Sequence, residues 1–312
     1  MSINAQKTEN EIMAKNTTKK IICNTLAVLS ASACLGLATA CETAHPEVEM
    51  IISFNGVEYT LEYELYRNIA PSTVNHFLWL VDNDYYNGLC VHNYDASSMK
   101  MYTGAYELSK EEGDADGLDY KEYFSEIAKF DNYADFPVSV WKDSQKTTPL
   151  YTLAGEFEAN GFTVENGAKK QSFGSLTMYY NEKSTKAKAY IPYRSEEKAG
   201  QMATREYKYN SATSEFYINL STTQSSNSKY CTFATLKGDS VEVLQDLQDA
   251  INDYIESTYE EEEGTSTTAQ FTSKHSVVVD TDDEIVAGSG KTVSYLVPNE
   301  AIVIKEIFTK KY

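Results

Sequence analysis

The side chains that could do chemistry in this chain of 312 residues do not fall into the spacings that metal or nucleophilic catalysis needs. The four histidines are scattered at His45, His76, His92 and His275, which argues against a zinc site. Residues 288–291 read GSGK, but they lack the spacing and the strand that precede a phosphate-binding loop. A hydrolase would need a nucleophile next to a base, and the sequence shows no such local pair.

Carboxylate side chains are more frequent than histidines, and calcium prefers oxygen ligands. Asp114, Asp116 and Asp119 lie close together, but a hand-type calcium loop that starts at Asp114 needs a glutamate at its twelfth position. Ser125 stands there instead. The sequence therefore predicts neither a metal site nor a cofactor.

The overall charge narrows the possible partners. Acidic side chains outnumber basic ones by 46 to 27, which gives a formal net charge of -19. Such a chain repels a phosphate backbone, so nucleic acid is not an expected partner. The 24 tyrosines, against 12 phenylalanines, suit a wet and hydrogen-bonded surface better than a cofactor site.

The amino terminus has the pattern of an export signal. Lys19 and Lys20 precede an apolar run from 21 to 40, and this run ends in LATAC at Cys41. Small residues before a cysteine resemble the bacterial lipobox, in which Cys41 would be lipidated. The alternatives are an ordinary cleaved signal with a chance cysteine, or a single anchoring helix. We expect a lipoprotein signal peptide at residues 1–40, then a linker at 41–49.

Lipidation would decide where the protein works. Two acyl chains supply stable attachment, so we expect the folded part at the extracytoplasmic face of a bacterial cell membrane. In an exported protein Cys90 and Cys231 could form a disulfide. Each alone also fits a small buried residue of a strand, and this interpretation favours two separate thiols.

The elements that must position any site begin at Met50. Residues 50–66 are typical of two strands around Asn55 and Gly56, a dipeptide favoured in tight hairpins. Pro71 suits the first turn of a helix, on which His76 is expected at the surface or as a cap. Four apolar residues of this helix share one face: Val74, Phe77, Leu78 and Val81.

Two segments have a different composition. Residues 107–148 are rich in acids and predict a surface insertion, with a short amphipathic helix over 120–130. The inward side chains of that helix are expected to be Tyr123, Phe124 and Ile127. Residues 181–209 predict a second insertion, in which seven basic side chains oppose four acidic ones for a net +3.

The carboxyl-terminal third predicts a second long helix and a final strand. The apolar face of the helix consists of Val243, Leu244, Leu247 and Ile251. An acidic loop is expected at about 258–275, and a closing strand at 297–307, with Pro298 entering it from outside the ladder.

Six segments, taken in order, resemble the cyclophilin family of peptidyl-prolyl isomerases. They include ELYRNIAPSTVNHF before residue 78, EFEANG at 156–161, GSLTM at 174–178 and NSATSEFYINL at 210–220. The other two are the second helical segment and the closing strand. The resemblance implies a mainly β domain over residues 50–312. This domain would be a closed eight-stranded antiparallel barrel capped by two helices, with the two insertions added.

The resemblance also implies a site and a reaction. Rotating a prolyl bond costs roughly 20 kcal/mol because twisting removes amide resonance, and cyclophilins lower this barrier with an arginine that donates to the prolyl nitrogen. Asn93 occupies the arginine position and is neutral and shorter. Tyr102 and Glu215 stand at the two glutamine positions. The implied substrate-binding residues are His92, Met99, Lys100, Tyr179, Phe216, Tyr217 and Tyr230.

Three hypotheses for function remain. The first is a membrane-anchored, extracytoplasmic prolyl isomerase or foldase, a monomer that acts on proline-containing exported polypeptides, with Lys100 or Arg205 supplying the missing positive charge. The second is a catalytically degenerate, cyclophilin-like module for peptide binding or surface interaction. The third is that the basic insertion docks an acidic polymer.

Overall fold

A computed structural model describes residues 43–109, 117–162, 169–180, 187–225, 228–260, 266–279 and 291–312. The chain divides into residues 1–41 and 42–312, and all the described residues belong to the second unit. The expected signal peptide, Cys41, Asp114 and Asp116 therefore lie outside them. Within the described ranges, no helix is long and apolar enough to cross a bilayer.

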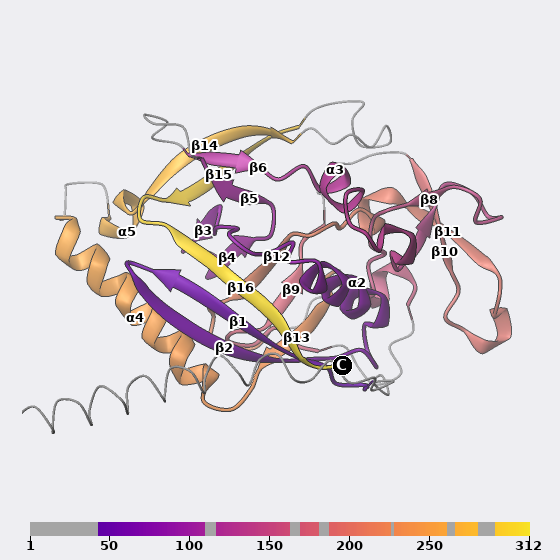
Figure 1. The fold of residues 1–312 in the computed structure, drawn as a ribbon, viewed down its shortest axis with the longest axis horizontal. Helices are drawn as coiled ribbons and strands as arrows, with labels where there is room; N and C mark the ends of the chain where they lie inside the picture. Colours follow the sequence, from indigo (N-terminus) through magenta and orange to yellow (C-terminus); the bar gives the residue numbers. More distant parts are fainter. Residues whose placement is uncertain are drawn as a thin grey trace, which may run out of the picture. The chain divides into compact units, whose positions relative to one another are not determined.

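The second unit is built around an eight-stranded antiparallel sheet, so the prediction of a mainly β fold is confirmed. Its strands are β1 (Glu47–Phe54), β2 (Val57–Leu65), β3 (Asn93–Asp95), β4 (Lys100–Thr103), β9 (Leu176–Met178), β12 (Phe216–Asn219), β13 (Thr232–Leu236) and β16 (Ile302–Lys311). Their order is β16-β1-β2-β13-β9-β12-β4-β3. Figure 1 shows the long strands β1, β2 and β16 side by side.

The two edges of this sheet meet through a short contact. Cys90, just before β3, forms an antiparallel bridge with Val303 of β16. The Gly88 amide also donates to the Ile304 carbonyl at 2.8 Å. The expected closed barrel is therefore a strongly curled sheet whose edges are joined by this bridge.

The expected hairpin is confirmed at β1 and β2. Asn55 and Gly56 have φ angles of 47° and 76°, the left-handed pair that a two-residue turn of this kind requires. Because β1 begins at Glu47, the expected linker at 41–49 is wrong for its last three residues. They belong to the sheet.

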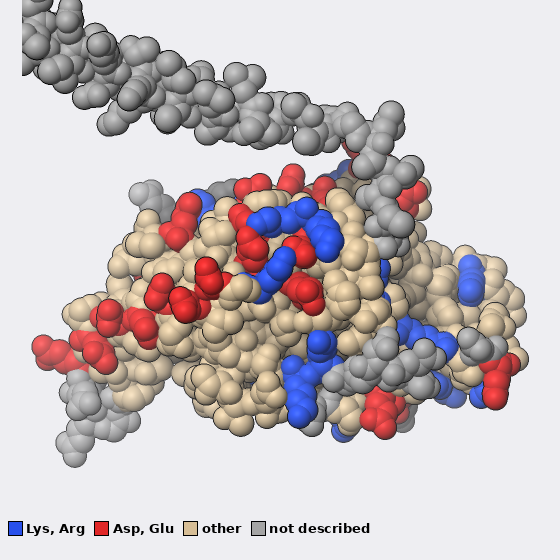
Figure 2. Space-filling model, turned by 90° about the horizontal axis from the view of Figure 1, so that it is seen from below, with Lys and Arg blue, Asp and Glu red and all other residues tan. Residues whose placement is uncertain are grey.

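Two long helices cover the sheet, α2 (Pro71–Asp82) and α4 (Ser240–Thr258). The predicted apolar face of α2 is buried, and α4 buries Leu244, Leu247 and Ile251 while Val243 is half-buried. The opposite face of α4 exposes Glu242, Asp246, Asp249, Asp253 and Glu256. In Figure 2 a row of acidic side chains runs along the left, where α4 lies in Figure 1.

The two predicted insertions join each other in a second sheet of order β11-β10-β7-β8. Its strands are β7 (Val140–Trp141), β8 (Pro149–Leu150), β10 (Lys188–Pro192) and β11 (Met202–Glu206). This sheet has its own apolar cluster, made of Val140, Leu150, Ala154, Phe162, Ala189, Ile191, Ala203 and Tyr207. Figure 1 shows β8, β10 and β11 on the side of the main sheet away from α4.

The first insertion is not only a surface segment. Its helix α3 (Tyr123–Ile127) buries Tyr123 and Ile127 in the main core, together with Phe136, while Phe124 is half-buried. The expectation of a surface insertion is therefore wrong for these residues, because their rings and methyl groups fill the space beside α2. The insertion also contributes β6 (Leu118–Tyr120), which pairs with β5 (Tyr106–Leu108).

A hairpin near the carboxyl terminus was not expected. It consists of β14 (Thr272–Val279) and β15 (Lys291–Pro298). The expected acidic loop at 258–275 therefore contains α5 (Thr267–Gln270) and the start of β14. The expected strand 297–307 is divided, because Pro298 ends β15 and β16 begins at Ile302. Short 3₁₀ helices complete the fold at η1 (Tyr133–Asp135), η2 (Glu158–Asn160), η3 (Glu196–Lys198) and η4 (Tyr207–Asn210).

Many tyrosines lie in the core, contrary to the expectation of a wet tyrosine surface. Those among the largest fully buried side chains are Tyr63, Tyr85, Tyr86, Tyr123, Tyr207 and Tyr217. Burial is tolerable where the hydroxyl finds a partner. The Tyr86 hydroxyl donates to the Ser214 carbonyl at 3.2 Å, and the Tyr85 hydroxyl accepts from Ser214 Oγ at 3.1 Å.

A buried carboxylate completes the first turn of α2. Ala70 at its N-cap makes no side-chain hydrogen bond, so the first amides need another acceptor. Glu156 Oε1 accepts from the Ser72 amide at 3.1 Å, and Oε2 accepts from the Thr73 amide and hydroxyl, both at 2.7 Å. Arg194 of the second insertion pairs with the same carboxylate. One fully buried charge thus joins α2 to the smaller sheet.

Replacing this carboxylate should destabilise the fold. We expect Glu156→Gln to lower the free energy of unfolding by about 2 kcal/mol, since the amide leaves Arg194 without its counter-charge and a helix donor without an acceptor. Urea denaturation measures the change. Glu158→Gln, at an exposed position of η2, is the matched control and should change stability by less than about 0.5 kcal/mol. Equal unfolding midpoints for the two variants would contradict this role.

His76 is buried on α2, with 1% of its surface exposed, so the expectation of a surface or capping histidine is wrong. Its Nε2 lies 2.9 Å from the Thr213 carbonyl, and its ring packs at 5.3 Å against that of Phe136. Burial lowers the pKa of His76 from 6.5 to about 4, and the Thr213 hydrogen bond opposes this shift.

Stability should therefore depend on pH through His76. Between pH 6.5 and about 4 the unfolded state binds a proton that the folded state does not, so stability falls as the pH drops through this window. At about 1.4 kcal/mol per pH unit, His76 accounts for a loss of roughly 3 kcal/mol. His76→Asn should flatten the difference between urea midpoints at pH 7 and pH 4. An unchanged pH dependence would exclude this source.

Candidate functional site

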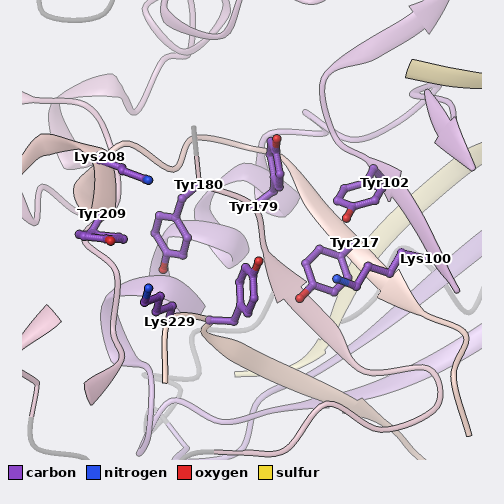
Figure 3. A pocket seen from close by; sticks show the side chains of 9 residues that line it. Lys100, Tyr102, Tyr179, Tyr180, Lys208, Tyr209, Tyr217 and Lys229 are labelled. Atoms are coloured by element: carbon purple, nitrogen blue, oxygen red, sulfur yellow. The ribbon is translucent and has the colours of Figure 1, made fainter. Parts of the chain in front are cut away.

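A pocket of about 320 Å³ lies on the side of β4 and β12 that faces away from the main core. The described residues that line it are Lys100, Tyr102, Tyr179, Tyr180, Lys208, Tyr209, Tyr217, Lys229 and Tyr230 (Figure 3). They are all tyrosines and lysines. Five of them are candidate site residues from the sequence: Lys100, Tyr102, Tyr179, Tyr217 and Tyr230.

Strand β12 presents alternate residues to the core and to the pocket. Phe216 and Ile218 belong to the main core, and the Phe216 ring packs 5.7 Å from that of Phe77. Tyr217 points the other way and lines the pocket. Placing Phe216 among the substrate-binding residues was therefore wrong, because a residue next to Tyr217 on a strand must face the opposite side.

Strand β4 follows the same rule. Met101 is buried in the core, while Lys100 and Tyr102 on either side of it reach the pocket. In the antiparallel register Tyr102 lies opposite Tyr217, and their ring centroids are 5.2 Å apart. Tyr179, just after β9, packs its ring 5.5 Å from Tyr102. Two neighbouring strands and one strand end thus form an aromatic wall.

Lys100 holds a positive charge against this wall. Its Nζ lies 4.5 Å from the centre of the Tyr217 ring and 5.6 Å from that of Tyr230. Such contacts stabilise an ammonium group over the electron-rich ring faces. Burial lowers the pKa of Lys100, and the charge of Asp95 partly offsets this effect.

The other end of the pocket was missed by the sequence reasoning. It contains Lys208 and Tyr209 of η4 and Lys229 just before β13, with Tyr180 next to them in Figure 3. The net positive charge of the second insertion was the available signal for Lys208. Periodicity could not show which lysine of that segment reaches the main sheet.

Asn93 does not line the pocket. Its Oδ1 accepts a hydrogen bond from the Leu296 amide at 2.9 Å, so the side chain is directed toward β15. Met99, 40% exposed and with a positive φ of 55°, is also outside the lining. Neither residue is therefore part of the pocket lining.

His92, which is buried, lies next to the half-buried Glu215. His92 Nε2 lies 3.5 Å from Glu215 Oε2, and the imidazole is fully buried. Its ring packs 4.8 Å from Tyr106 and 4.9 Å from Tyr295. His92 and Glu215 are thus close to each other, but neither is among the described residues that line the pocket, and His92 packs against Tyr295 of β15.

Arg205 is held by backbone carbonyls outside the pocket. Its Nε donates to the Asn160 carbonyl at 2.8 Å, and Nη1 donates to the Thr204 carbonyl at 3.0 Å. Of the two cations that could replace the family arginine, Lys100 is therefore the one in the pocket.

The thiols are separate and buried, as the sequence favoured. Burial raises the pKa of Cys231 to about 11 and that of Cys90 to about 12, so neither thiol is reactive at neutral pH. Across the described ranges no group of three or more His, Cys, Asp or Glu side chains is arranged to hold a metal ion.

The comparison with family models identifies the family. The family model for cyclophilin type peptidyl-prolyl cis-trans isomerases matches residues 49–269. The chain belongs to this family, and membership supports an isomerase or foldase-like function. No curated protein sequence matches the chain.

Solved structures similar to the chain include a cyclophilin type peptidyl-prolyl cis-trans isomerase of Cryptosporidium parvum. The identity is 14% over 86% of this chain and 99% of that one, with a TM-score of 0.39. For its structure in the presence of the dipeptide Ala-Pro, the identity is 16%, the coverage 85% and 99%, and the TM-score 0.39. For the Mimivirus cyclophilin these values are 15%, 86% and 91%, and 0.38.

Proposed function

We propose that the protein is a prolyl isomerase or foldase-like protein that binds proline-containing polypeptides in the tyrosine and lysine pocket. The observation that carries this proposal is the position of Lys100. Its ammonium group, on β4, lies over the ring of Tyr217 on the neighbouring strand β12. The tyrosine rings offer a flat surface for a proline ring, and the cation lies beside it.

Lys100 can replace the missing guanidinium in one respect. Twisting the prolyl bond leaves a lone pair on nitrogen, which accepts a hydrogen bond only in the twisted state. A donor in a partly desolvated pocket stabilises that state more strongly than one in water. The reaction needs no covalent step and no cofactor, so one well-placed ammonium group and an aromatic wall are sufficient chemistry.

A second function is favoured by the position of Asn93. Because its side chain bonds the Leu296 amide, the strand that carries the family arginine has no donor in the pocket. The alternative is a module that binds proline-containing segments without catalysing their isomerisation.

Variants of Lys100 separate the two functions. We expect Lys100→Ala to lower kcat/KM for a proline peptide by about a hundredfold, the size of effect seen when one transition-state donor is removed. Exchange spectroscopy by NMR measures isomerisation and binding in one sample. Lys188→Ala, at an exposed position of β10 outside the pocket, is the control and should retain wild-type turnover.

The pH profile adds a readout that a structural defect would not move. Activity should decline as the pH rises through the pKa of Lys100, which burial holds below the ordinary value of 10.5. Lys100→Arg keeps its charge and should shift this decline to higher pH. Wild-type protein that binds the peptide without catalysing exchange would establish the second function instead.

We also propose that the protein is lipidated at Cys41 and acts, as a monomer, on exported polypeptides at the extracytoplasmic face of a bacterial membrane. The support is the sequence pattern alone, in which Lys19 and Lys20 precede an apolar run that ends in LATAC. Attachment would place the pocket where newly exported chains fold.

Lipidation can be tested by labelling. Expressed in a bacterial host with an alkyne-tagged fatty acid, the wild-type chain should take up label and sediment with membranes. Cys41→Ala should lose the label, whereas Cys34→Ala, within the apolar run, should retain it. Wild-type protein that takes up no label would exclude the anchor.

A further inference from the structure

We propose that the pocket selects polypeptides in which an acidic side chain lies a few residues from the proline. The Lys208 and Lys229 end binds the carboxylate while the proline rests at the Lys100 and Tyr217 end. This inference rests on the proposed function and adds a substrate class to it.

The first argument is the charge of the lining. Lys100, Lys208 and Lys229 all reach one pocket, and of the described lining residues none is acidic. Within the described part of the chain, neither Lys100 nor Lys208 takes part in an ion pair. The like charges of Lys100 and Lys208 border one cavity without an acidic lining residue, so an anion that enters is attracted to them.

The second argument is where the surplus of acid lies. The chain has a net charge of -19, yet acidic side chains are arranged along exposed surfaces such as α4 and not in this pocket (Figure 2). The lining of the pocket is thus basic, whereas the protein as a whole is acidic.

The third argument is a buried polar group without a partner. Tyr180 lines the pocket with 7% of its surface exposed, and its hydroxyl has no hydrogen-bond partner among the described residues. A buried donor left unsatisfied is unfavourable, and a ligand oxygen would satisfy it. In Figure 3 the Tyr180 ring lies between Lys208 and Lys229, and its hydroxyl is directed toward the Lys229 side.

The geometry sets the order of the groups. Figure 3 shows Lys208, Tyr209 and Lys229 at one end, and Lys100, Tyr102 and Tyr217 at the other, with Tyr179 and Tyr180 between them. A single small anion would occupy one end only. An extended polypeptide spans both, because each residue advances the chain by about 3.3 Å. The occupant is therefore a peptide with separated acidic and prolyl residues.

Calorimetric titration of the full-length chain tests this inference. The ligands are peptides with one common Ala-Pro core and with Glu, Gln or Lys at successive positions on either side. At the best position the Glu peptide should bind about tenfold more tightly than the Gln peptide, the gain from one charge-assisted hydrogen bond, and the Lys peptide more weakly still. Added salt should reduce the difference.

Charge variants locate the effect. Lys208→Gln with Lys229→Gln should lower the affinity for the Glu peptide to that for the Gln peptide, while the double arginine variant retains the preference. Lys188→Gln, from the same insertion but outside the pocket, should also retain it. The melting temperature of each variant shows whether it is folded.

The outcomes are distinguishable. Equal binding of the Glu and Gln peptides at every position overturns the acidic preference and leaves the proposed function standing. The inference is also overturned if an acidic peptide without proline binds as tightly as the Glu peptide with the Ala-Pro core. The pocket would then recognise the negative charge alone. If no peptide binds at all, the proposed function falls as well.

Discussion

The buried carboxylate of Glu156 is the constraint on which the arrangement of the rest depends. A charge in a core must be fully satisfied, and this one is satisfied by the first amides of α2 and by Arg194. Arg194 lies in the second insertion between β10 and β11, so the pair holds the smaller sheet against the main one. That sheet leads directly into η4, which brings Lys208 to the pocket. This ion pair thus helps to position the end of the pocket that contains Lys208.

Within the main sheet, the two-residue period of β4 and β12 separates stability from binding. Met101, Phe216 and Ile218 fill the core, while the residues between and beside them form the aromatic wall. A one-residue slip in register would exchange the two sets. The packing of Phe216 against α2 therefore also fixes the position of Tyr217, which carries the cation of Lys100 on its ring face.

The chain belongs to the cyclophilin family and has a pocket lined by tyrosines and lysines. Asn93, which the sequence resemblance assigns to the arginine position of the family, accepts a hydrogen bond from the β14–β15 hairpin. Positive charge instead comes from β4, from η4 and from the segment before β13. A lysine ammonium is a compact point charge on a flexible stem, whereas an arginine guanidinium is a planar group with several donors in a fixed arrangement. A pocket lined by lysines therefore binds a ligand through its charge more than through paired hydrogen bonds in one plane.

The sequence by itself determined the elements whose signals are local. Asn55 and Gly56 specified a tight hairpin, Pro71 and the spacing of Val74 and Phe77 specified α2, and the order of the family segments specified the main sheet. Five of the pocket residues could also be named in advance. The tertiary structure alone decided that the two insertions pair with each other, that His76 is buried and that Lys208 and Lys229 meet Lys100. The reason is physical: hairpins and helix faces depend on neighbours within a few residues, whereas a shared pocket depends on contacts between segments more than a hundred residues apart.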